Sequence, residues 1–391
     1  MHSNCRRRRR GEAVTRPSSK GKAHTMQMQA AVLNEFNTPF SIETVDLAPP
    51  QAGEVLIKVA AAGICHSDWH VVEGHSYFPL PIICGHEGAG IVESVGDGVS
   101  SVKAGDHVTL SFRANCGDCF YCQRDKANLC EVFAPVLRSG LMQDGSSRIT
   151  RAGEPIHIMT GLGCFAEYVV IPESAAVPIR SDVPLEVAAL VGCAVSTGVG
   201  AAMYTADVRP GESVAVYGAG GVGLNIIMGA VMCGADPVIA VDTNSNKMEI
   251  AREFGATHTL YSDDSSVSEI QALTGGRGAD HVFESVGLSF LQERGLEATR
   301  PGGTLTLVGL TPFGSGTNLP GAVITRTEKV IRGSFYGSVN TQRDFPIFIE
   351  LYRAGKLKLD ELVTQRYRLD EINEAYANML TGEVARGIIV F

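Results

Sequence analysis

One glycine-rich stretch constrains the fold of this chain more than any other feature. Residues 218–223 read Gly-Ala-Gly-Gly-Val-Gly, directly after an apolar strand-like segment at 213–217 and at the start of a helix-like segment at 221–233. Asp242 follows Gly223 by 19 residues, at the end of the next strand-like segment. A G-x-G-x-x-G turn between a strand and a helix, with an acidic residue about 20 positions later, is typical of a dinucleotide-binding βαβ unit.

The residue types in this stretch indicate how a dinucleotide would be held. Glycines permit a tight turn and a close approach of the backbone to a pyrophosphate, whose charge the helix N-terminus stabilises. The Asp242 carboxylate would accept hydrogen bonds from the adenosine ribose hydroxyls and repel a 2′-phosphate, which favours NAD over NADP. The alternative is a glycine-rich turn that holds another nucleotide, such as FAD or an adenylate. The predicted cofactor-binding residues here are Gly218, Gly220, Gly221, Val222, Gly223, Asp242 and Lys247.

The segments around the motif predict two kinds of domain. The chain has 391 residues, which is too long for one hydrophobic core. Strand-like and helix-like segments alternate after about residue 213, as in a doubly wound parallel sheet. Residues 29–111 are instead rich in strand-like segments, which favours an antiparallel β domain. The expected strands are 54–59, 90–95, 165–171, 213–217, 237–241, 258–260, 281–284, 304–310 and 387–391, and the expected helices are 185–204, 221–233, 245–254, 345–354 and 369–380.

A cluster of four cysteines indicates a bound metal. Cys116, Cys119, Cys122 and Cys130 lie within 15 residues, separated by short polar segments. This spacing suits a structural zinc with four thiolate ligands and no open position. The alternative is a set of disulfides or unrelated thiols. The cluster predicts a contribution to stability and not to catalysis.

Three further residues form a weaker candidate for a metal site. Cys65, His86 and Cys193 each lie next to a glycine-containing segment but are far apart in the sequence. A lone cysteine is more often a small buried side chain, and a lone histidine is more often structural. The residues alone give only a possible set of two sulfurs and one imidazole, which would leave the fourth position of a zinc ion open to a substrate.

The first 27 residues differ from the rest of the chain. They include five consecutive arginines at 6–10, carry eight basic residues against one acid, and contain almost no large apolar residue. We expect this segment to be disordered. It is not a secretory signal, because no apolar stretch follows the arginines. It is interpreted as the product of a start codon upstream of Met26 or Met28, as a functionless tail, or as a transit peptide or anion-binding arm.

Charge and cysteine usage exclude several classes of function. The whole chain has a net charge of −9, and without the basic tail the charge is −16, which disfavours nucleic acid as a partner. No uninterrupted apolar run approaches the roughly 18 residues that a membrane span needs. Clustered rather than paired thiols favour a reducing compartment, so we expect a cytoplasmic protein without membrane partners.

The chain resembles the zinc-containing medium-chain alcohol dehydrogenases over residues 28–391. The resemblance rests on Gly-His-Glu-x-x-Gly-x5-Gly-x-x-Val at 85–99, on the four-cysteine segment and on the nucleotide motif, in the family's order and at its distances. It implies an α/β fold in which a Rossmann coenzyme domain, 195–335, is inserted into a mainly β, GroES-like catalytic domain, 28–194 and 336–391. It also implies NAD and two Zn²⁺ per subunit, one catalytic and one structural.

The resemblance assigns the dispersed residues to a catalytic zinc. It implies that Cys65, His86 and Cys193 are the zinc ligands and that Glu87 lies behind the metal as a transient ligand. Asp68 would hold the far ring nitrogen of His86. Glu87 could instead be a member of a buried ion pair.

The resemblance also assigns the proton relay and further coenzyme contacts. Ser67 matches the residue that takes the alcohol proton, and His70 matches the histidine that passes it to solvent through the coenzyme ribose. Arg386 matches a pyrophosphate contact, and Thr197 a coenzyme contact. His66 stands where many members carry a pyrophosphate-binding arginine, which puts the coenzyme affinity in doubt. Ser67 and His70 could also be ordinary loop residues.

The implied activity is reversible hydride transfer from a primary alcohol, aromatic or of medium chain length, to NAD. Phe112 and Met159 either line an apolar substrate pocket or belong to the core. One alternative is thiol-dependent formaldehyde oxidation, whose enzymes carry an arginine where this chain has Ala134, with Arg138 nearby. They also carry an acid where this chain has residues 76–77, Ser-Tyr. Both departures disfavour glutathione.

The resemblance also bears on assembly. The 34 residues between Cys130 and Phe165 form the long version of this segment, which accompanies dimers. We therefore expect a homodimer that pairs near residues 304–319. An alternative of another class is a non-catalytic zinc- and NAD(H)-binding redox sensor, which the intact proton relay disfavours.

Overall fold

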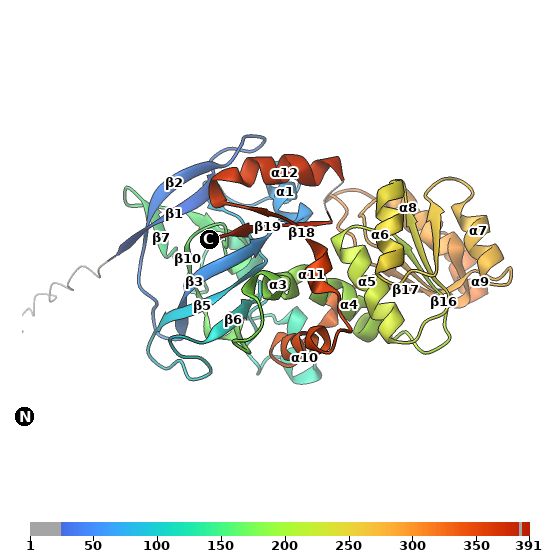
Figure 1. Ribbon diagram of the computed structural model, residues 1–391, viewed down its shortest axis with the longest axis horizontal. Coiled ribbons are helices and arrows are strands. Elements are labelled where there is room, and N and C mark those ends of the chain that lie inside the picture. The colour runs from blue at the N-terminus through green and yellow to red at the C-terminus, as the bar shows by residue number, and fades with distance from the viewer. Residues whose placement is uncertain (1–24, 383–384) are drawn as a thin grey trace, which may run out of the picture.

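The computed structural model describes residues 25–382 and 385–391. Figure 1 shows an elongated molecule with a strand-rich part at one end and a compact unit of alternating strands and helices at the other. The C-terminal elements, drawn in red, lie in the strand-rich part beside the N-terminal strands, drawn in blue. The chain therefore leaves the first part, builds the second, and returns to the first.

The second part is built on a parallel sheet. Within the described residues it has six strands in the order β14-β13-β12-β15-β16-β17, and every neighbouring pair is parallel. The chain order reverses between β12 and β15, which is the doubly wound arrangement that places a ligand crevice at the reversal. The expected parallel sheet is thus confirmed. The strands are β12 Val214–Tyr217, β13 Val238–Asp242, β14 His258–Tyr261, β15 Ala279–Glu284, β16 Thr299–Leu307 and β17 Val330–Gly333.

Helices follow the strands of this sheet. A G-x-G-x-x-G turn leads from β12 into α5. The α-helices of the described chain are α1 His66–Val72, α2 Val136–Ser139, α3 Leu185–Leu190, α4 Ser196–Gly200, α5 Gly221–Met232, α6 Ser245–Glu253, α7 Ser266–Leu273, α8 Ser289–Ala298, α9 Gly321–Thr327, α10 Thr341–Arg353, α11 Leu359–Leu362 and α12 Ile372–Thr381.

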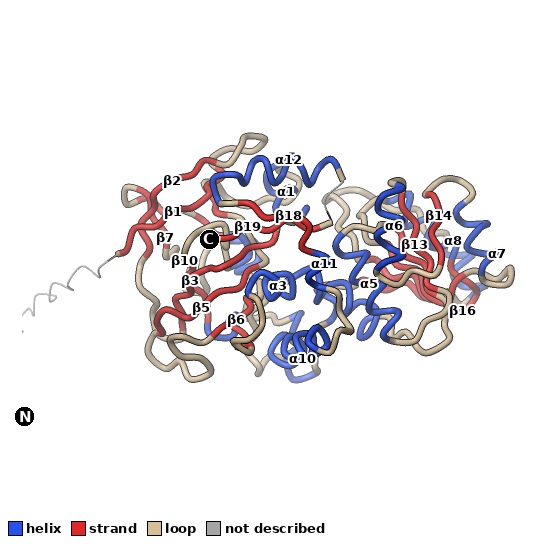
Figure 2. The backbone as a smooth tube through the Cα atoms, viewed as in Figure 1, coloured by secondary structure: helices blue, strands red, loops and turns tan. Residues whose placement is uncertain are grey.

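Both faces of the parallel sheet are covered (Figure 2). Successive side chains of a strand point to opposite faces, so alternate residues of β12 enter different cores. Val214 and Val216 pack with the apolar residues of α5, whereas Ala215 and Tyr217 pack with residues of α7 and α8. Burial on both faces explains why these strands are continuously apolar.

The first part contains two further sheets. One has the order β8-β7-β2-β1-β4-β9, and the other has the order β11-β6-β5-β3-β19-β18 with β10 paired to β3. The C-terminal strand β19 is antiparallel to β3, which ties the end of the chain to its beginning. The strands are β1 Met26–Leu33, β2 Ser41–Leu47, β3 Glu54–Gly63, β4 Ile82–Ile83, β5 Gly88–Val95, β6 His107–Leu110, β7 Ile149–Arg151, β8 Glu154–Pro155, β9 His157–Ile158, β10 Tyr168–Pro172, β11 Ala176–Ile179, β18 Val363–Tyr367 and β19 Arg386–Val390.

A long apolar helical segment joins the two parts. Leu185–Thr205 is long enough to cross a membrane, and an 18-residue window of it has a mean hydropathy of 1.7, yet 83% of that window is buried inside the protein. The segment consists of α3, a π-helical stretch η5 (Val191–Val195), α4 and a second π-helical stretch η6 (Ala201–Thr205). It packs against α5 in a shared core, and this burial explains its apolar composition.

The expected elements are present, with shifted ends. β16 starts at Thr299, five residues before the predicted 304, and the predicted helix at 369–380 begins as a 3₁₀ turn, η8 (Leu369–Glu371). Most of the predicted basic tail lies outside the described residues. Its predicted boundary at residue 27 was wrong, because Met26 and Gln27 already pair with β2 as part of β1. The domain boundaries at 195 and 335 stay a prediction.

Candidate active site

The four clustered cysteines converge at one point on the surface of the first part. Their sulfur atoms are separated by 4.0 Å for Cys116 and Cys122, 3.9 Å for Cys119 and Cys130, and 3.7 Å for Cys130 and Cys116. Four sulfurs at the usual 2.3 Å from a tetrahedral zinc would lie about 3.8 Å apart, whereas a disulfide needs about 2.0 Å. The cluster therefore has the dimensions of a closed four-thiolate zinc site.

Local backbone geometry builds this four-cysteine lobe, which we define as residues 116–130. Two short 3₁₀ turns, η1 (Cys122–Arg124) and η2 (Ala127–Leu129), bring the last two cysteines back toward the first two. A hydrogen bond from the backbone of Cys122 is the main reason that the pKa of the Cys119 thiol falls to about 6. Backbone donors of this kind stabilise thiolate charge, which a zinc ligand must carry.

A buried arginine, which the sequence did not single out, fixes the lobe to the domain. Arg113 donates from Nε to the Asn128 carbonyl at 2.6 Å and from Nη2 to the Cys130 carbonyl at 2.9 Å. It is 4% exposed, so its positive charge lies close to the thiols in a largely water-free setting. No spacing rule marks a single arginine before a cysteine cluster.

The three dispersed residues also converge, although they come from distant elements. Cys65 precedes α1, His86 lies in the loop between β4 and β5, and Cys193 lies in the π-helical stretch η5. One ligand atom of each, together with a carboxylate oxygen of Glu87, lies within 4.8 Å of all the others, and all four residues are buried. The fold thus gathers two sulfurs, one imidazole and one carboxylate, a set that neither spacing nor composition could join.

Asp68 lies beside the His86 ring, and its predicted role in orienting that ring stays a prediction. The Oδ2 atom of Asp68 lies 3.0 Å from Nδ1 of His86, and the Oδ1 atom accepts a hydrogen bond from the backbone of Gly85 at 2.8 Å. Burial opposes the charged ring, but the negative charges of Asp68 and Cys65 raise the pKa of His86 well above its usual value. With Nδ1 engaged, Nε2 is the atom left for a metal.

The sulfur atoms and the acid of the cluster are electrostatically linked. A hydrogen bond between the two thiols holds the pKa of Cys65 well below its usual range and raises that of Cys193. Burial raises the pKa of Glu87, and the positive charge of Arg386 opposes this rise. Glu87 Oε2 forms a buried ion pair with Arg386. A buried ion pair was one of the two interpretations of Glu87 in the sequence analysis, but Arg386 was not predicted as its partner.

The glycine-rich loop has the geometry that a dinucleotide needs. Gly218 has a φ of +95°, and a Cβ on Gly223 would lie 1.8 Å from the carbonyl oxygen of Gly218, so neither position tolerates a side chain. The Asp242 carboxylate accepts hydrogen bonds from the backbones of Ala219 at 2.7 Å and Asn244 at 3.0 Å. Asp242 therefore lies at the loop, where a ribose would be expected.

Arg386 lies between the loop and the metal cluster. A Cβ on Gly221, the first residue of α5, would lie 2.4 Å from its Cδ and 3.3 Å from its Nε, while its Nη2 pairs with Glu87. The Nε atom is buried without a hydrogen-bond partner among the described residues. One side chain thus spans the distance from the α5 N-terminus to the acid of the cluster.

The other predicted residues lie around this junction. Ser67 and His70 are half-buried on α1, and His66 is exposed at the start of the same helix. The Thr197 hydroxyl lies one turn after Cys193, 3.9 Å from its sulfur. Lys247, on α6, is half-buried after Asp242. Their functional roles stay predictions.

An aromatic cluster covers one side of the metal set. The Phe112 ring contacts the His86 ring edge-on, with centroids 5.5 Å apart, and lies 4.1 Å from the ring of Tyr336. Tyr336 is buried and donates a hydrogen bond to the carbonyl of Gly192, next to Cys193. Met159 is buried in the core of the strand-rich part. Phe112 is therefore beside the site, and the sequence did not single out Tyr336.

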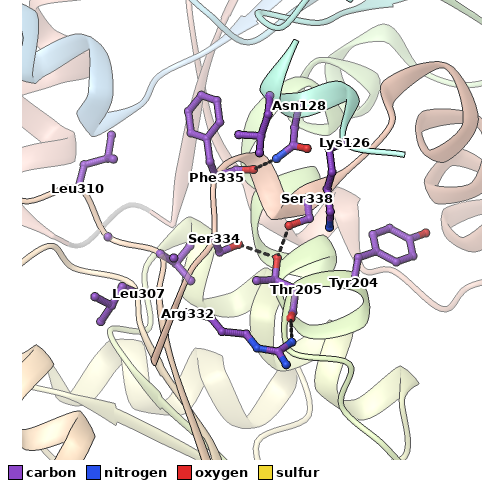
Figure 3. A pocket seen from close by; sticks show the side chains of 14 residues that line it. Lys126, Asn128, Tyr204, Thr205, Leu307, Leu310, Arg332, Ser334, Phe335 and Ser338 are labelled. Carbon is purple, nitrogen blue, oxygen red and sulfur yellow. Dashed lines mark hydrogen bonds between the residues drawn. The ribbon is translucent and has the colours of Figure 1, made fainter. Parts of the chain in front are cut away.

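A cavity of about 580 Å³ lies between the four-cysteine lobe and the end of the parallel sheet (Figure 3). Asn128 closes it on the lobe side by donating to the Phe335 carbonyl at 2.8 Å, and Thr205 bonds to Ser338 at 2.9 Å. The Phe335 ring in its wall lies 6.4 Å from Phe112, which in turn contacts His86. The cavity is therefore two aromatic rings away from the metal set.

Comparison with protein families places both parts of the chain. Residues 51–181 match the alcohol dehydrogenase GroES-like domain, and residues 221–354 match the zinc-binding dehydrogenase domain. These matches confirm the expected combination of a GroES-like domain with a Rossmann domain, whose sheet is the parallel one described above.

Relatives match almost the whole chain. An NDMA-dependent alcohol dehydrogenase of Amycolatopsis methanolica is 44% identical over 368 residues, covering 93% of this chain and 99% of its own. The crystal structure of benzyl alcohol dehydrogenase from Acinetobacter calcoaceticus is 32% identical with a TM-score of 0.89, covering 94% of this chain and 99% of its own. A short chain alcohol dehydrogenase from Escherichia coli, solved with NADH, is 25% identical with a TM-score of 0.77, covering 93% of this chain and 99% of its own.

Proposed function

The chain belongs to the zinc-containing medium-chain alcohol dehydrogenases, and from that premise we propose that it oxidises a primary alcohol reversibly to the aldehyde, with zinc as the Lewis acid and NAD as the hydride acceptor. One observation carries the proposal. The ligand atoms of Cys65, His86 and Cys193 converge within 4.8 Å, and Arg386 connects this cluster to the glycine-rich loop.

The donor atoms fit zinc at both sites. Thiolate and imidazole ligands suit zinc, and two sulfurs with one imidazole leave a coordination position for a substrate oxygen. The sulfur separations of 3.7–4.0 Å in the lobe suit a closed tetrahedral site. We therefore assign the catalytic metal to the dispersed set and the structural metal to the lobe.

The residues at the end of β12 have the features that dinucleotide binding needs. The Nε of Arg386, which is buried and has no hydrogen-bond partner among the described residues, can donate to a pyrophosphate oxygen beside the α5 N-terminus. A Cβ on Gly220 would meet nothing within 4 Å, so there is open space at this position. Asp242, at the end of β13 beside the glycine-rich loop, would accept hydrogen bonds from the ribose hydroxyls and repel a 2′-phosphate.

We assign roles to this chain's residues from the contacts described above and, for Ser67 and His70, from the resemblance to the family. When bound, zinc supplies Lewis acidity toward the alcohol oxygen, and the nicotinamide accepts the hydride. Asp68 fixes the ring of His86, and Arg386 neutralises Glu87. The hydroxyl of Ser67 takes the alcohol proton and passes its own toward His70. The side chain of His70 is 27% exposed, so it can release the proton to water.

Aromatic walls favour an aromatic or medium-chain alcohol. Phe112 covers the ring of His86, and Phe335 extends this surface toward the cavity. The similarity to a benzyl alcohol dehydrogenase supports the same class of substrate. Arg138 stacks on the ring of Phe313, 4.8 Å from its centroid, which gives no support to glutathione carboxylate binding by that arginine.

Kinetic measurements on the zinc-loaded protein test the proposal. We expect NADH to form with benzyl alcohol and NAD⁺, with a higher kcat/KM than with ethanol and a much lower rate with NADP⁺. Replacing Asp242 by glycine should narrow the preference for NAD⁺ over NADP⁺. No NADH from a broad panel of alcohols would contradict the proposal and favour a redox sensor. A requirement for added glutathione would favour the thiol-dependent alternative.

The relative named for NDMA gives a second candidate for the electron acceptor. The same assay run with NDMA in place of, and together with, free NAD⁺ separates the two. Turnover with NDMA alone, without release of NADH, would show that NDMA and not free NAD⁺ is the electron acceptor. The proposal for the alcohol-oxidising site would be unchanged.

We also propose a homodimer. Strand β17 forms one edge of the parallel sheet, and Leu310 and Phe313, in the segment after β16, are 58% and 73% exposed. An unpaired strand edge with nearby apolar side chains is a surface that a second copy would cover. Size-exclusion chromatography with light scattering should give twice the mass of one chain, and a tetramer or monomer mass would contradict this proposal.

A further inference from the structure

A second histidine and an acid lie beside His70 at the end of α1. The helix ends at Val72, and Gly74, with a φ of +72°, reverses the chain there. The Ser76 backbone then donates to the His70 carbonyl at 2.9 Å, which holds His75 against the last helical turn. His70, Glu73 and His75 are therefore brought together by backbone geometry, with one potential ligand atom of each within 4.8 Å of the others.

The spacing of these atoms fits ligands around a metal ion, although Glu73 and His75 also lie within hydrogen-bond distance of each other. Oε2 of Glu73 lies 3.7 Å from Nδ1 of His70 and 3.1 Å from Nδ1 of His75. Ligands at about 2.1 Å from a tetrahedral zinc are about 3.4 Å apart, midway between these two distances. The first distance is too long for a hydrogen bond.

One atom of the cluster lacks a partner, and the cluster is open to solvent. Nδ1 of His70 is buried without a hydrogen-bond partner among the described residues. The side chains of Glu73 and His75 are 35% and 51% exposed, so an ion can reach the group from water. The ring centroids of Trp69 and Tyr376 are 5.4 Å apart, and this stacking packs α1 against α12 (Figure 1), so His70 would stand on an anchored helix.

We propose that His70, Glu73 and His75 bind a divalent zinc-type ion, separate from the catalytic and structural sites. Two imidazoles and one carboxylate are ligands typical of zinc, and water would fill the fourth position. Magnesium and calcium prefer oxygen ligands and should not compete. The ion would take the lone pair of Nδ1 of His70 and keep the proton on Nε2, so the ring could accept no further proton.

Occupancy of this site would therefore block the proton relay, a consequence that rests on the proposed function. The binding of the ion does not depend on the proposed function. If His70 passes protons to water, excess zinc should slow alcohol oxidation by the intact enzyme, and removing His75 should relieve the inhibition.

Equilibrium dialysis against Zn²⁺ tests the binding. The protein is first freed of loosely held metal while its catalytic and structural zinc are retained, and metal content is then measured against free Zn²⁺. We expect wild type and His258→Ala, a control at another exposed histidine, to take up one more zinc per chain than His75→Ala. Glu73→Gln should also lose this equivalent, which guards against misfolding of the first variant. Added Mg²⁺ should leave uptake unchanged.

Chemical protection gives a second readout that does not depend on activity. Bound zinc should shield His70 and His75, but not His258, from diethylpyrocarbonate, as measured by mass spectrometry of the labelled peptides. Equal zinc uptake by wild type, His75→Ala and Glu73→Gln, or no protection of His70, would overturn the site.

The two proposals fail in distinguishable ways. Zinc uptake that depends on His75 in a protein that oxidises no alcohol would contradict the proposed function and leave the metal site intact. Alcohol oxidation by a protein that shows no such zinc uptake would support the proposed function and contradict the metal site. Each variant's rate with excess zinc is compared with its own rate without it, and equal inhibition of wild type and His75→Ala would contradict the effect on the relay.

Discussion

The two cysteine-containing sites of this protein are built in opposite ways. The four-cysteine lobe takes its sulfurs from one stretch of 15 residues, shaped by local turns. The dispersed site takes Cys65, His86 and Cys193 from elements that are far apart in the sequence, and all three are buried. The lobe supplies four sulfurs, whereas the dispersed site supplies two sulfurs, one imidazole and a carboxylate paired with an arginine.

This difference in construction indicates different roles: the lobe would contribute to stability and the dispersed site to catalysis. In the proposed assignment, four thiolates would fill a tetrahedral zinc in the lobe and leave no position for a substrate, so the lobe would serve structure alone. The dispersed set would leave a position open and would therefore depend on surrounding groups for its shape. Asp68, Glu87 and Arg386 provide that support, and Arg386 also links the site to the coenzyme loop.

The comparison is tested most severely by removing one ligand of the dispersed site. Cys193→Ser should lower kcat/KM by about a thousandfold, because a catalytic zinc contributes several kcal/mol to the transition state. The zinc content should fall by one per chain while the lobe zinc stays. Cys233→Ser, a cysteine outside both sites, is the matched control and should keep full activity. Full activity in Cys193→Ser would contradict the assignment of Cys193 as a ligand of a catalytic zinc.

Removing a ligand of the lobe should produce the opposite pattern. Cys119→Ser should lower the free energy of unfolding by roughly 3–5 kcal/mol, because binding of a structural metal contributes directly to folding. Urea unfolding followed by circular dichroism measures this change. The kcat of the protein that remains folded should change far less than in the Cys193 variant. A selective loss of kcat without a loss of stability would contradict the structural role of the lobe.

A milder change separates the ligands from the residue that orients them. Asp68→Asn removes the negative charge 3.0 Å from Nδ1 of His86 and should weaken zinc binding at the dispersed site by about 10–100-fold. Zinc retention against a chelator is the measurement. Asp118→Asn, an exposed acid between two lobe cysteines, is the control and should leave the affinity of both sites unchanged.

The smallest effect is expected at the anchor of the lobe. Arg113→Met removes two hydrogen bonds to carbonyls of Asn128 and Cys130 and should lower the free energy of unfolding by about 1–2 kcal/mol. Arg124→Met, on the exposed surface of the lobe, should change it by less than about 0.5 kcal/mol. Chemical denaturation compares the two, and equal effects would mean that Arg113 does not tie the lobe to the domain.

The same contrast explains what could be predicted from sequence. The lobe and the glycine-rich loop can be predicted from the sequence because the residues of each lie close together in the chain and need particular spacings. The dispersed set needed the resemblance to a family, because no local rule joins Cys65 to Cys193. The Glu87–Arg386 pair spans 299 residues, and the π-helical turn at Cys193 depends on packing, so neither has a local signal. Arg113 and Tyr336 act through contacts that only the folded chain creates.

The third cluster of possible metal ligands also has a local pattern in the sequence. His70-x-x-Glu73-x-His75 is a spacing that can place three ligands around a helix end, and it is visible in the sequence. The expected tail boundary missed Met26 because its strand partner, β2, comes later in the chain. Element ends are set by pairing partners and caps, which propensity alone does not fix.

Anomalous diffraction from crystals of the purified protein, collected on both sides of the zinc absorption edge, tests the contrast between the two sites most directly. We predict one zinc peak among the four lobe sulfurs and another between Cys65, His86 and Cys193, on the side facing the glycine-rich loop. A zinc peak in the lobe with none at the dispersed residues, in protein that oxidises alcohols, would contradict the assignment of the catalytic centre.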